Sequence, residues 1–341
     1  MSERCFMFER LKIASASILT FPRALGPGRR ARRDETIDGK AQSGFEFVIA
    51  GSDSALVQRA PSVNLRDAMR EVPRRLVSVL GVGICDVTKQ DAMRLLEGLV
   101  CACNRRCHSV FFVNTHTLNV ATDQPDFRNV LNSADFVFND GTGVRWAARQ
   151  RGMELRDNLV GTDLIPEFLR ATGKRGYRYF LLGADPDTIA KAAAVARERF
   201  VGWTQAGYHH GFVSDEQCGE LVNRINATNA DVLLVGMGNP LQERWIHGNQ
   251  SRLRVPLAIG VGGLFDHWID KPKRAPLWVR RMGCEWIHKL LLQPHKWRRY
   301  LIGNPLFLYR IARSKQQDLA AMRSYNGSTL GTAARLYPIG S

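Results

Sequence analysis

Three short segments place polar or glycine residues at the end of an apolar run, where they could do chemistry. Asp140 ends the run FVFND, and its carboxylate could accept a proton as a general base. Glycines such as those of GMGNPLQERW let backbone amides approach a phosphate, ahead of a helix start that favours negative charge. The candidates are Asp140 in NDGTG, Thr117 and Asn119 in NTHTLN, and Gly236, Gly238 and Gln242 in GMGNPLQERW.

Each segment also has an ordinary structural interpretation. Asp followed by Gly after a strand commonly forms a turn, and Thr and Asn commonly cap helices and turns. The G-x-G at Gly236 and Gly238 lacks the third glycine of a dinucleotide-binding fingerprint, as does the one at Gly81 and Gly83. No single segment therefore assigns a function.

Four potential metal ligands lie close together at Cys101, Cys103, Cys107 and His108. Their C-x-C-x3-C-H spacing matches no familiar metal site and falls within a helical pattern, so we interpret them as helix residues and expect no bound metal. The seven cysteines of the chain follow no regular framework, which indicates reduced thiols and a cytoplasmic setting.

Short apolar runs that alternate with helical patterns must position these residues. The runs, from Val77 onward, are VSVLGVGI, VFFVN, FVFND, YRYFLLGA, DVLLVGMG and PLAIGVGG, and they are typical of strands buried on both faces. The segments DPDTIAKAAAVARERF and SDEQCGELVNRINATN open with an Asp or Ser suited to a helix N-cap. We therefore predict an α/β protein with a mainly parallel sheet and helices on both faces. Its ligands would bind beyond the carboxyl ends of the strands.

The 341 residues carry a formal charge of +16, which implies an anionic partner: nucleic acid, a membrane surface or a phosphorylated substrate. Composition divides the chain into a poorly ordered basic extension (1–75), a core (76–270), a helical appendage (271–315) and a flexible tail (316–341). No run reaches the ~18–20 apolar residues of a membrane-spanning helix. The segment LKIASASILTFPRAL is broken by Pro22, and we do not interpret it as a signal peptide.

The span from Lys271 to Lys315 contains twelve Lys or Arg residues and a single acid, Glu285. Four of the seven tryptophans lie in or beside it, at 268, 278, 286 and 297. Apolar residues recur at every fourth position in Trp278, Met282, Trp286 and Leu290. This pattern predicts an amphipathic basic helix suited to a membrane surface.

Taken together, the motifs resemble the WecG/TagA/CpsF glycosyltransferases, family 26 of that classification. The resemblance runs from about Val77 to about Ile311 and leaves out the first 75 residues. It is carried by TLN, NDGTGV, VGTDL, GMGNPLQERWI, IGVGGLFD, KRAPLWVRRMGCEWIHKLL and RRYLIGNPLFL. It implies a Rossmann-like core followed by a basic helical C-terminal appendage that contacts the membrane and helps to complete the active site.

The resemblance implies an inverting transfer of a sugar, of the N-acetylmannosamine type or glucose, from a UDP-sugar to a polyprenyl-diphosphate-linked saccharide. The enzyme would serve cell-surface polysaccharide biosynthesis as a peripheral protein on the cytoplasmic face of the inner (plasma) membrane. It would need neither a metal nor a cofactor. Its partners would be the UDP-sugar, the lipid-linked acceptor and anionic lipid, without nucleic acid, and a homo-oligomer is an open alternative.

The resemblance also implies roles for single residues. Asp140 matches the family's proposed general base, and Thr117 and Asn119 match positions that line the same pocket. Gln242 matches a donor-pocket position. The remaining matches are Gly236 and Gly238 near the nucleotide, Gly161 and Asp163 at another cleft edge, and Lys289, Arg298 and Arg299 as cations for the leaving diphosphate.

Two departures from the family pattern stand near these positions. Many relatives carry Arg-Val where this chain has Asn158 and Leu159, so a cationic contact is missing or is supplied elsewhere, for example by Arg156. Relatives often have Gly-Ala where this chain has Gly262 and Gly263, which bears on the choice of donor.

Two other classes of protein are alternatives. An NAD-dependent oxidoreductase would need a complete glycine fingerprint with an acid ~20 residues further on, and neither G-x-G supplies one. A nucleic-acid-binding protein would spread its basic residues over a groove with aromatic residues between them. Here many basic residues are concentrated in one amphipathic segment, which favours anionic lipid and diphosphate.

Overall fold

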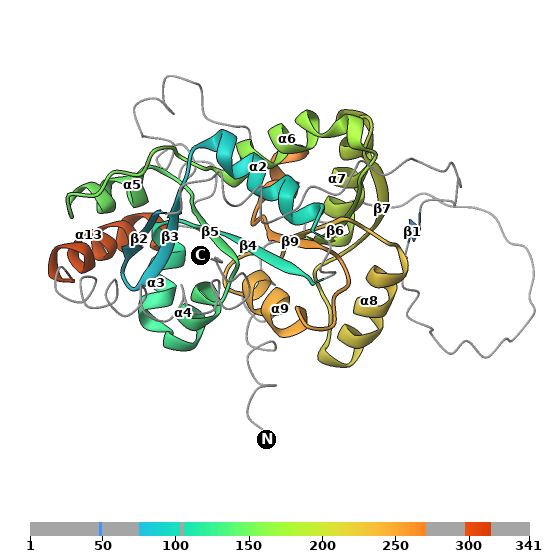
Figure 1. Cartoon of the computed structure of the whole chain (residues 1–341). Coiled ribbons are helices and arrows are strands. Elements are labelled where there is room, and N and C mark those ends of the chain that lie inside the picture. The colour runs from blue at the N-terminus through green and yellow to red at the C-terminus, as the bar shows by residue number, and fades with distance from the viewer. Residues whose placement is uncertain (1–47, 50–74, 103–105, 271–296, 315–341) are drawn as a thin grey trace, which may run out of the picture. The chain divides into compact units, whose positions relative to one another are not determined.

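The computed structural model describes residues 48–49, 75–102, 106–270 and 297–314 (Figure 1). Six strands form a parallel sheet in the order β7-β6-β8-β9-β4-β5, and a two-residue strand, β1 (Val48–Ile49), pairs antiparallel with β7. The six are β4 (His108–Val113), β5 (Phe136–Asn139), β6 (Arg178–Gly183), β7 (Thr204–His209), β8 (Val232–Gly236) and β9 (Leu257–Gly260). The predicted α/β fold with a mainly parallel sheet is confirmed.

Helices cover both faces of this sheet because alternate side chains of each strand point to opposite sides. Val110 and Phe112 of β4 belong to one buried cluster, and Phe111 and Val113 belong to the other. The first face carries α2 (Lys89–Val100), α6 (Gly161–Ala171), α7 (Pro186–Arg199) and α10 (Leu264–Trp268). The second carries α3 (Thr115–Asp123), α4 (Pro125–Asn132), α5 (Thr142–Arg149), α8 (Asp215–Ala227) and α9 (Leu241–Asn249).

Local capping bonds set where several of these helices begin. The side chain of Asp185 accepts a hydrogen bond from the amide of Thr188 at the start of α7. Ser214 and Gln217 form a reciprocal capping box at the start of α8. Both N-caps were predicted from the sequence, and both are confirmed.

The run VSVLGVGI is not one buried strand of the main sheet, so that prediction was wrong. It forms a hairpin of β2 (Arg75–Val79) and β3 (Val82–Asp86), a separate antiparallel pair. Leu80 and Gly81 make the turn with φ of 52° and 78°, a conformation that reverses the chain within two residues. The side chain of Asn132 holds this turn through the amide of Gly83 and the carbonyl of Gly81. The G-x-G there is thus a hairpin turn and no nucleotide loop.

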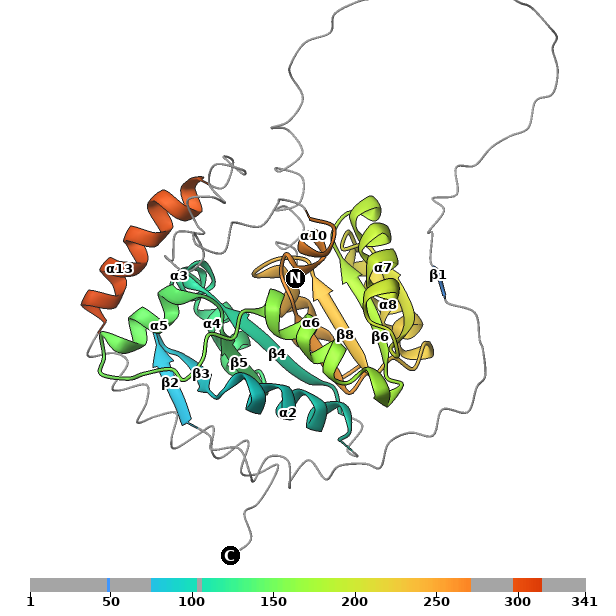
Figure 2. The ribbon, with the colours of Figure 1, turned by 90° about the horizontal axis from the view of Figure 1, so that it is seen from above.

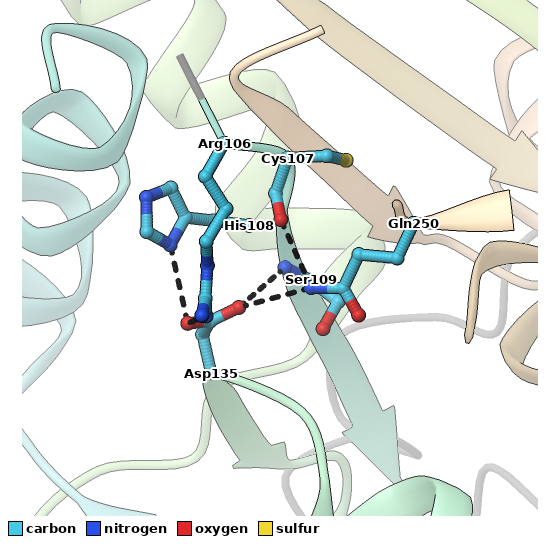
Figure 3. A network of polar contacts seen from close by, with 6 residues as sticks. All are labelled: Arg106, Cys107, His108, Ser109, Asp135 and Gln250. Atoms are coloured by element: carbon cyan, nitrogen blue, oxygen red, sulfur yellow. Dashed lines mark hydrogen bonds and ion pairs between the residues drawn. The ribbon is translucent and has the colours of Figure 1, made fainter. Parts of the chain in front are cut away.

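The helical interpretation of the cysteine cluster was also wrong in part. Cys101 is the C-cap directly after α2, but His108 begins β4 and Cys107 directly precedes it, whereas Cys103 lies outside the described residues. Figure 3 shows that the carboxylate of Asp135 receives bonds from Arg106, His108, Gln250 and the amide of Ser109. The side chain of Gln250 also donates to the carbonyl of Cys107. This network joins the amino ends of β4 and β5 to the end of α9.

Part of the predicted appendage is described and rests on the core. The short π-helical η4 (Arg298–Ile302) leads into α13 (Gly303–Arg313), which lies beside α3 in both views (Figures 1 and 2). Phe307 and Ile311 of α13 are buried in the second cluster. The stripe from Trp278 to Leu290 and nearly all of the predicted extension and tail lie outside the described residues.

Trp268 does not belong with the basic segment. It is the last residue of α10, and its ring is buried in the core against Phe200 and Phe265. Strand β7 was not foreseen, because TQAGYH has no sustained apolar run. In the described ranges we find no helix with both the length and the hydrophobicity that a membrane crossing requires.

Candidate active site

The carboxyl ends of β4, β5, β8 and β9 meet at one edge of the sheet. Asp140 directly follows β5, and its amide donates to the carbonyl of Val113 at the end of β4, at 2.8 Å. β9 lies between β4 and β8, so the turn at Gly262 stands between Asp140 and the turn at Gly238. The strand order therefore brings together segments that are about a hundred residues apart in sequence.

Asp140 stands where the starts of α3 and α5 approach each other. The Nδ2 atom of Asn114, the N-cap of α3, lies 3.5 Å from Asp140 Oδ2. Gly141 takes φ of 104°, which favours glycine, and a Cβ on Gly143 would lie only 2.4 Å from the Thr115 side chain. The glycines after Asp140 are thus required by the backbone turn and by the close approach of the two helices.

The departure at Asn158 has a structural consequence at the same place. Its Oδ1 accepts a hydrogen bond from the amide of Gly141 at 2.9 Å, so this residue fastens the loop before α6 to the residue after Asp140. Leu159 is buried in the core. Arg156, the suggested replacement for a missing cation, is bound to Asp86. The amide of Arg156 donates to the Asp86 carboxylate at 2.8 Å, and the Arg156 guanidinium forms an ion pair with the same carboxylate at 3.7 Å.

Thr117 and Asn119 lie on α3, and both are buried. The hydroxyl of Thr117 lies 3.3 Å from the side-chain oxygens of both Asn114 and Asn239, so it links the start of α3 to the turn after β8. The side chain of Asn119 instead faces the appendage. Its Nδ2 donates to the carbonyl of Gly303 at 2.7 Å.

The turns after β8 and β9 are fastened together by Gln242, which is buried. Its Oε1 accepts hydrogen bonds from the amides of Gly238 at 3.3 Å and Gly262 at 2.9 Å. Its Nε2 donates to Glu243 at 2.8 Å. A Cβ on Gly236 would lie 2.7 Å from the Phe265 ring, so close packing requires glycine there. The buried carboxamide of Gln242 thus holds the turns after β8 and β9 together at this edge of the sheet.

Sequence reasoning missed Glu243. An acid in the first turn of a helix is common, because it interacts favourably with the helix dipole. In the structure the side chain is fully buried, and burial raises its pKa to about 7 despite hydrogen bonds from Gln242 and Asn239. The only signal in the sequence was its place directly after Gln242.

Gly161 and Asp163 open α6 on the first face of the sheet, whereas Thr117 and Gln242 belong to helices of the second face. A Cβ on Gly161 would lie 3.2 Å from the Phe112 ring, so the helix starts in close contact with β4. Among the predicted cations, Arg298 is exposed and stacks over Trp297 at 5.5 Å. Arg299 follows it in η4, and Lys289 lies outside the described residues.

An exposed apolar surface runs along η4 and α13. Large hydrophobic side chains that are 44% to 56% exposed recur on it, and Arg298 and Arg313 lie among them. They are Trp297, Leu301, Ile302, Leu308 and Tyr309. Within the described part of the chain, no group of three or more His, Cys, Asp or Glu side chains is arranged to hold a metal ion.

The chain is similar to proteins of known activity over most of its length. A family model described as the glycosyl transferase WecG/TagA/CpsF family matches residues 77–320. A Staphylococcus aureus protein is 30% identical over 245 residues, which are 71% of this chain and 94% of that protein. A Bacillus subtilis protein is 33% identical over 189 residues, 55% of this chain and 73% of that protein. Both are named N-acetylglucosaminyldiphosphoundecaprenol N-acetyl-beta-D-mannosaminyltransferase.

Proposed function

The chain belongs to the WecG/TagA/CpsF glycosyl transferase family, and on this premise we propose that it transfers a hexose from a UDP-sugar to a polyprenyl-diphosphate-linked saccharide, with inversion. The sugar is of the N-acetylmannosamine type or glucose, and the product enters cell-surface polysaccharide biosynthesis. The names of the two relatives support a lipid-diphosphate acceptor and an N-acetylmannosamine donor. The observation that carries the proposal is the meeting of Asp140 with the two glycine turns at one sheet edge.

In this proposal Asp140 is the general base. The acceptor hydroxyl attacks the anomeric carbon and gives its proton to the Asp140 carboxylate. The bond from that carbon to the UDP oxygen breaks, and its electron pair leaves with the diphosphate. The support is positional: Asp140 ends a strand beside Asn114, at the edge where open parallel sheets bind ligands.

The departing diphosphate gains negative charge, which the protein must stabilise. We assign this to the N-terminus of α9 and to basic residues of the appendage, because the amides of Gly238 and Gly262 already donate to Gln242. The proposed cations are Lys289, Arg298 and Arg299. The enzyme is proposed to work without a metal or cofactor, and the concentration of twelve cations between Lys271 and Lys315 supports this assignment of the charge.

We further propose that the protein attaches peripherally to the cytoplasmic face of the inner membrane through its appendage. The exposed apolar surface of η4 and α13 supports this, because its tryptophan and leucine side chains are suited to the headgroup boundary. Each Lys or Arg near an anionic surface contributes about 1 kcal/mol, so several together suffice for attachment.

The experiment is a screen of UDP-sugars with a polyprenyl-diphosphate-linked saccharide, with the anomeric configuration of the product read by NMR. We expect one donor to be transferred with inversion, in the presence or absence of EDTA. Salt, but not nuclease, should release the protein from membranes. Retention of configuration would contradict the role of Asp140, and reduction of NAD without sugar transfer would contradict the whole proposal.

A further inference from the structure

A chain of close polar contacts leads from Asp140 to both glycine turns, and within it the single hydroxyl hydrogen of Thr117 is shared between the oxygens of Asn114 and Asn239. Some steps lie within one helix, as between Asn114 and Thr117 or between Gln242 and Glu243, and others join separate segments, as between Thr117 and Asn239. The path runs through Asp140, Asn114, Thr117, Asn239, Glu243 and Gln242 to the amides of Gly238 and Gly262. It connects the segment that carries the proposed base with the two turns that border the proposed donor site.

Glu243 is the centre of this path, and its environment is unusual for an acid. The side chain has no exposed surface, and both neighbouring carboxamides, of Asn239 and Gln242, donate to its Oε1. Within the described residues, Oε2 has no hydrogen-bond partner and no cation acts on the carboxyl group. Burying an acid without a paired cation costs free energy, so Glu243 adds no stability through an ion pair, and its contacts are with the two amides.

We propose that Glu243 is a positioning residue that fixes the orientation of the Asn239 and Gln242 carboxamides and thereby the shape of the donor site. Because it concerns the same site, this inference rests on the proposed function. Glu243 itself need not contact the substrate. It acts through the two amides that it holds.

The orientation follows from hydrogen-bond chemistry. A carboxamide has two orientations that exchange its oxygen with its NH2 group. Glu243 Oε1 is an acceptor and selects the orientation in which both amides present NH2 to it. The oxygen of Gln242 is thereby turned toward the amides of Gly238 and Gly262, and that of Asn239 toward the Thr117 hydroxyl.

Two substitutions of Glu243 separate the effect of its acceptor oxygen from the effect of its size. Glu243→Gln keeps an acceptor oxygen at similar size, and we expect donor KM and kcat close to those of the wild type. Glu243→Leu leaves both amides without an acceptor in a buried place. Since a displacement of about 1 Å at a site can cost about 10²-fold in rate, we expect kcat/KM for the UDP-sugar to fall about 10²-fold, chiefly through a raised KM for the donor.

Asn249→Leu is the matched control. Asn249 is a buried polar residue at the other end of the same helix, where it donates to the Trp245 carbonyl and accepts from Cys218. Its loss should destabilise the fold while donor KM is unchanged. If a substitution only damages the fold, it lowers the fraction of active enzyme but does not change the KM for the donor.

A second measurement does not depend on sugar transfer. Hydrogen exchange, read by mass spectrometry, should accelerate over residues 236–243 and 257–264 in Glu243→Leu, but not in Glu243→Gln or Asn249→Leu. If the wild type transfers no sugar, the proposed function fails and exchange alone decides the role of Glu243. If the wild type is active but Glu243→Leu keeps its donor KM or its exchange pattern, the positioning role is overturned. Should Glu243→Leu not fold, Asn239→Ala removes one of the two donors, and an unchanged donor KM there would likewise overturn it.

Discussion

Arg310 of α13 donates hydrogen bonds to both oxygens of Asn119 in α3, to the backbone oxygen at 2.8 Å and to Oδ1 at 3.2 Å. The same guanidinium pairs with Asp123 at the end of α3. Asn119, which family resemblance placed in the substrate pocket, is therefore occupied with holding the appendage. Because the N-cap of α3 contacts Asp140, the appendage is attached to the helix that borders the proposed base.

Arg310→Ala should detach α13 from α3. Hydrogen bonds that involve a charged group contribute about 1.5–3 kcal/mol, so we expect the free energy of unfolding to fall by about 2 kcal/mol. Transfer to a lipid-linked acceptor should fall as well. Arg313→Ala is the control, because it removes the same charge from the same helix, where Arg313 contacts the Tyr309 ring and hydroxyl. Equal losses in both variants would indicate a charge effect on lipid binding and no docking role for Arg310.

Asp140→Asn should leave the protein folded and able to bind UDP, because an amide fits where the carboxylate stood. The turnover number should fall by about 10²–10⁴, the usual contribution of a positioned general base. Steady-state kinetics and calorimetric titration with UDP measure the two quantities. Near-normal transfer by this variant would remove Asp140 from its proposed role.

The raised pKa of Glu243 should make the stability of the protein depend on pH. Burial raises its pKa from 4.5 to about 7, so the folded protein keeps a proton that the unfolded chain releases. The stabilisation is complete below pH 4.5 and is lost as pH rises toward 7, by at most about 3 kcal/mol. Glutamine does not titrate, so the unfolding free energy of the wild type relative to Glu243→Gln should decline across that window and then level off. If the difference in unfolding free energy between the two proteins stays constant from pH 4.5 to 8, the pKa of Glu243 is not raised.

For Asp135 we expect the opposite pH dependence: its contribution to the unfolding free energy is lost as the pH falls. Its burial alone would raise the pKa, but the bond from His108 and the charges of His108 and Arg106 outweigh burial and hold the pKa below 3.8. This carboxylate therefore stabilises the fold above pH 3.8, and the stabilisation is lost as pH falls through the lowered pKa. Asp135→Asn should lower the unfolding free energy at pH 7 by about 2 kcal/mol, since the amide keeps only one of the two acceptor oxygens and loses the charge that pairs with Arg106. Chemical denaturation from pH 3 to 7 should show the difference shrinking as the wild type is acidified.

The predictions that depended on neighbours in the chain were largely confirmed. Strand runs such as DVLLVGMG and the N-caps at Asp185 and Ser214 were readable because burial on both faces and capping bonds involve residues a few positions apart. The hairpin at Leu80 was misjudged although it is local, because a non-glycine residue with positive φ leaves little trace in composition.

The sequence by itself determined the parallel α/β sheet, the family, and the sheet edge that Asp140, Thr117 and the Gly238 turn would share. Tertiary structure alone decided what those side chains touch. Asn119 meets Arg310 across 191 positions, and Thr117 meets Asn239 across 122. The burial that raises the pKa of Glu243 likewise arises only in the folded chain. Which groups a side chain binds, and how deeply it is buried, depend on how far apart residues lie in space. The pattern of residue types along the chain does not give those distances until the order of the strands in the sheet is known.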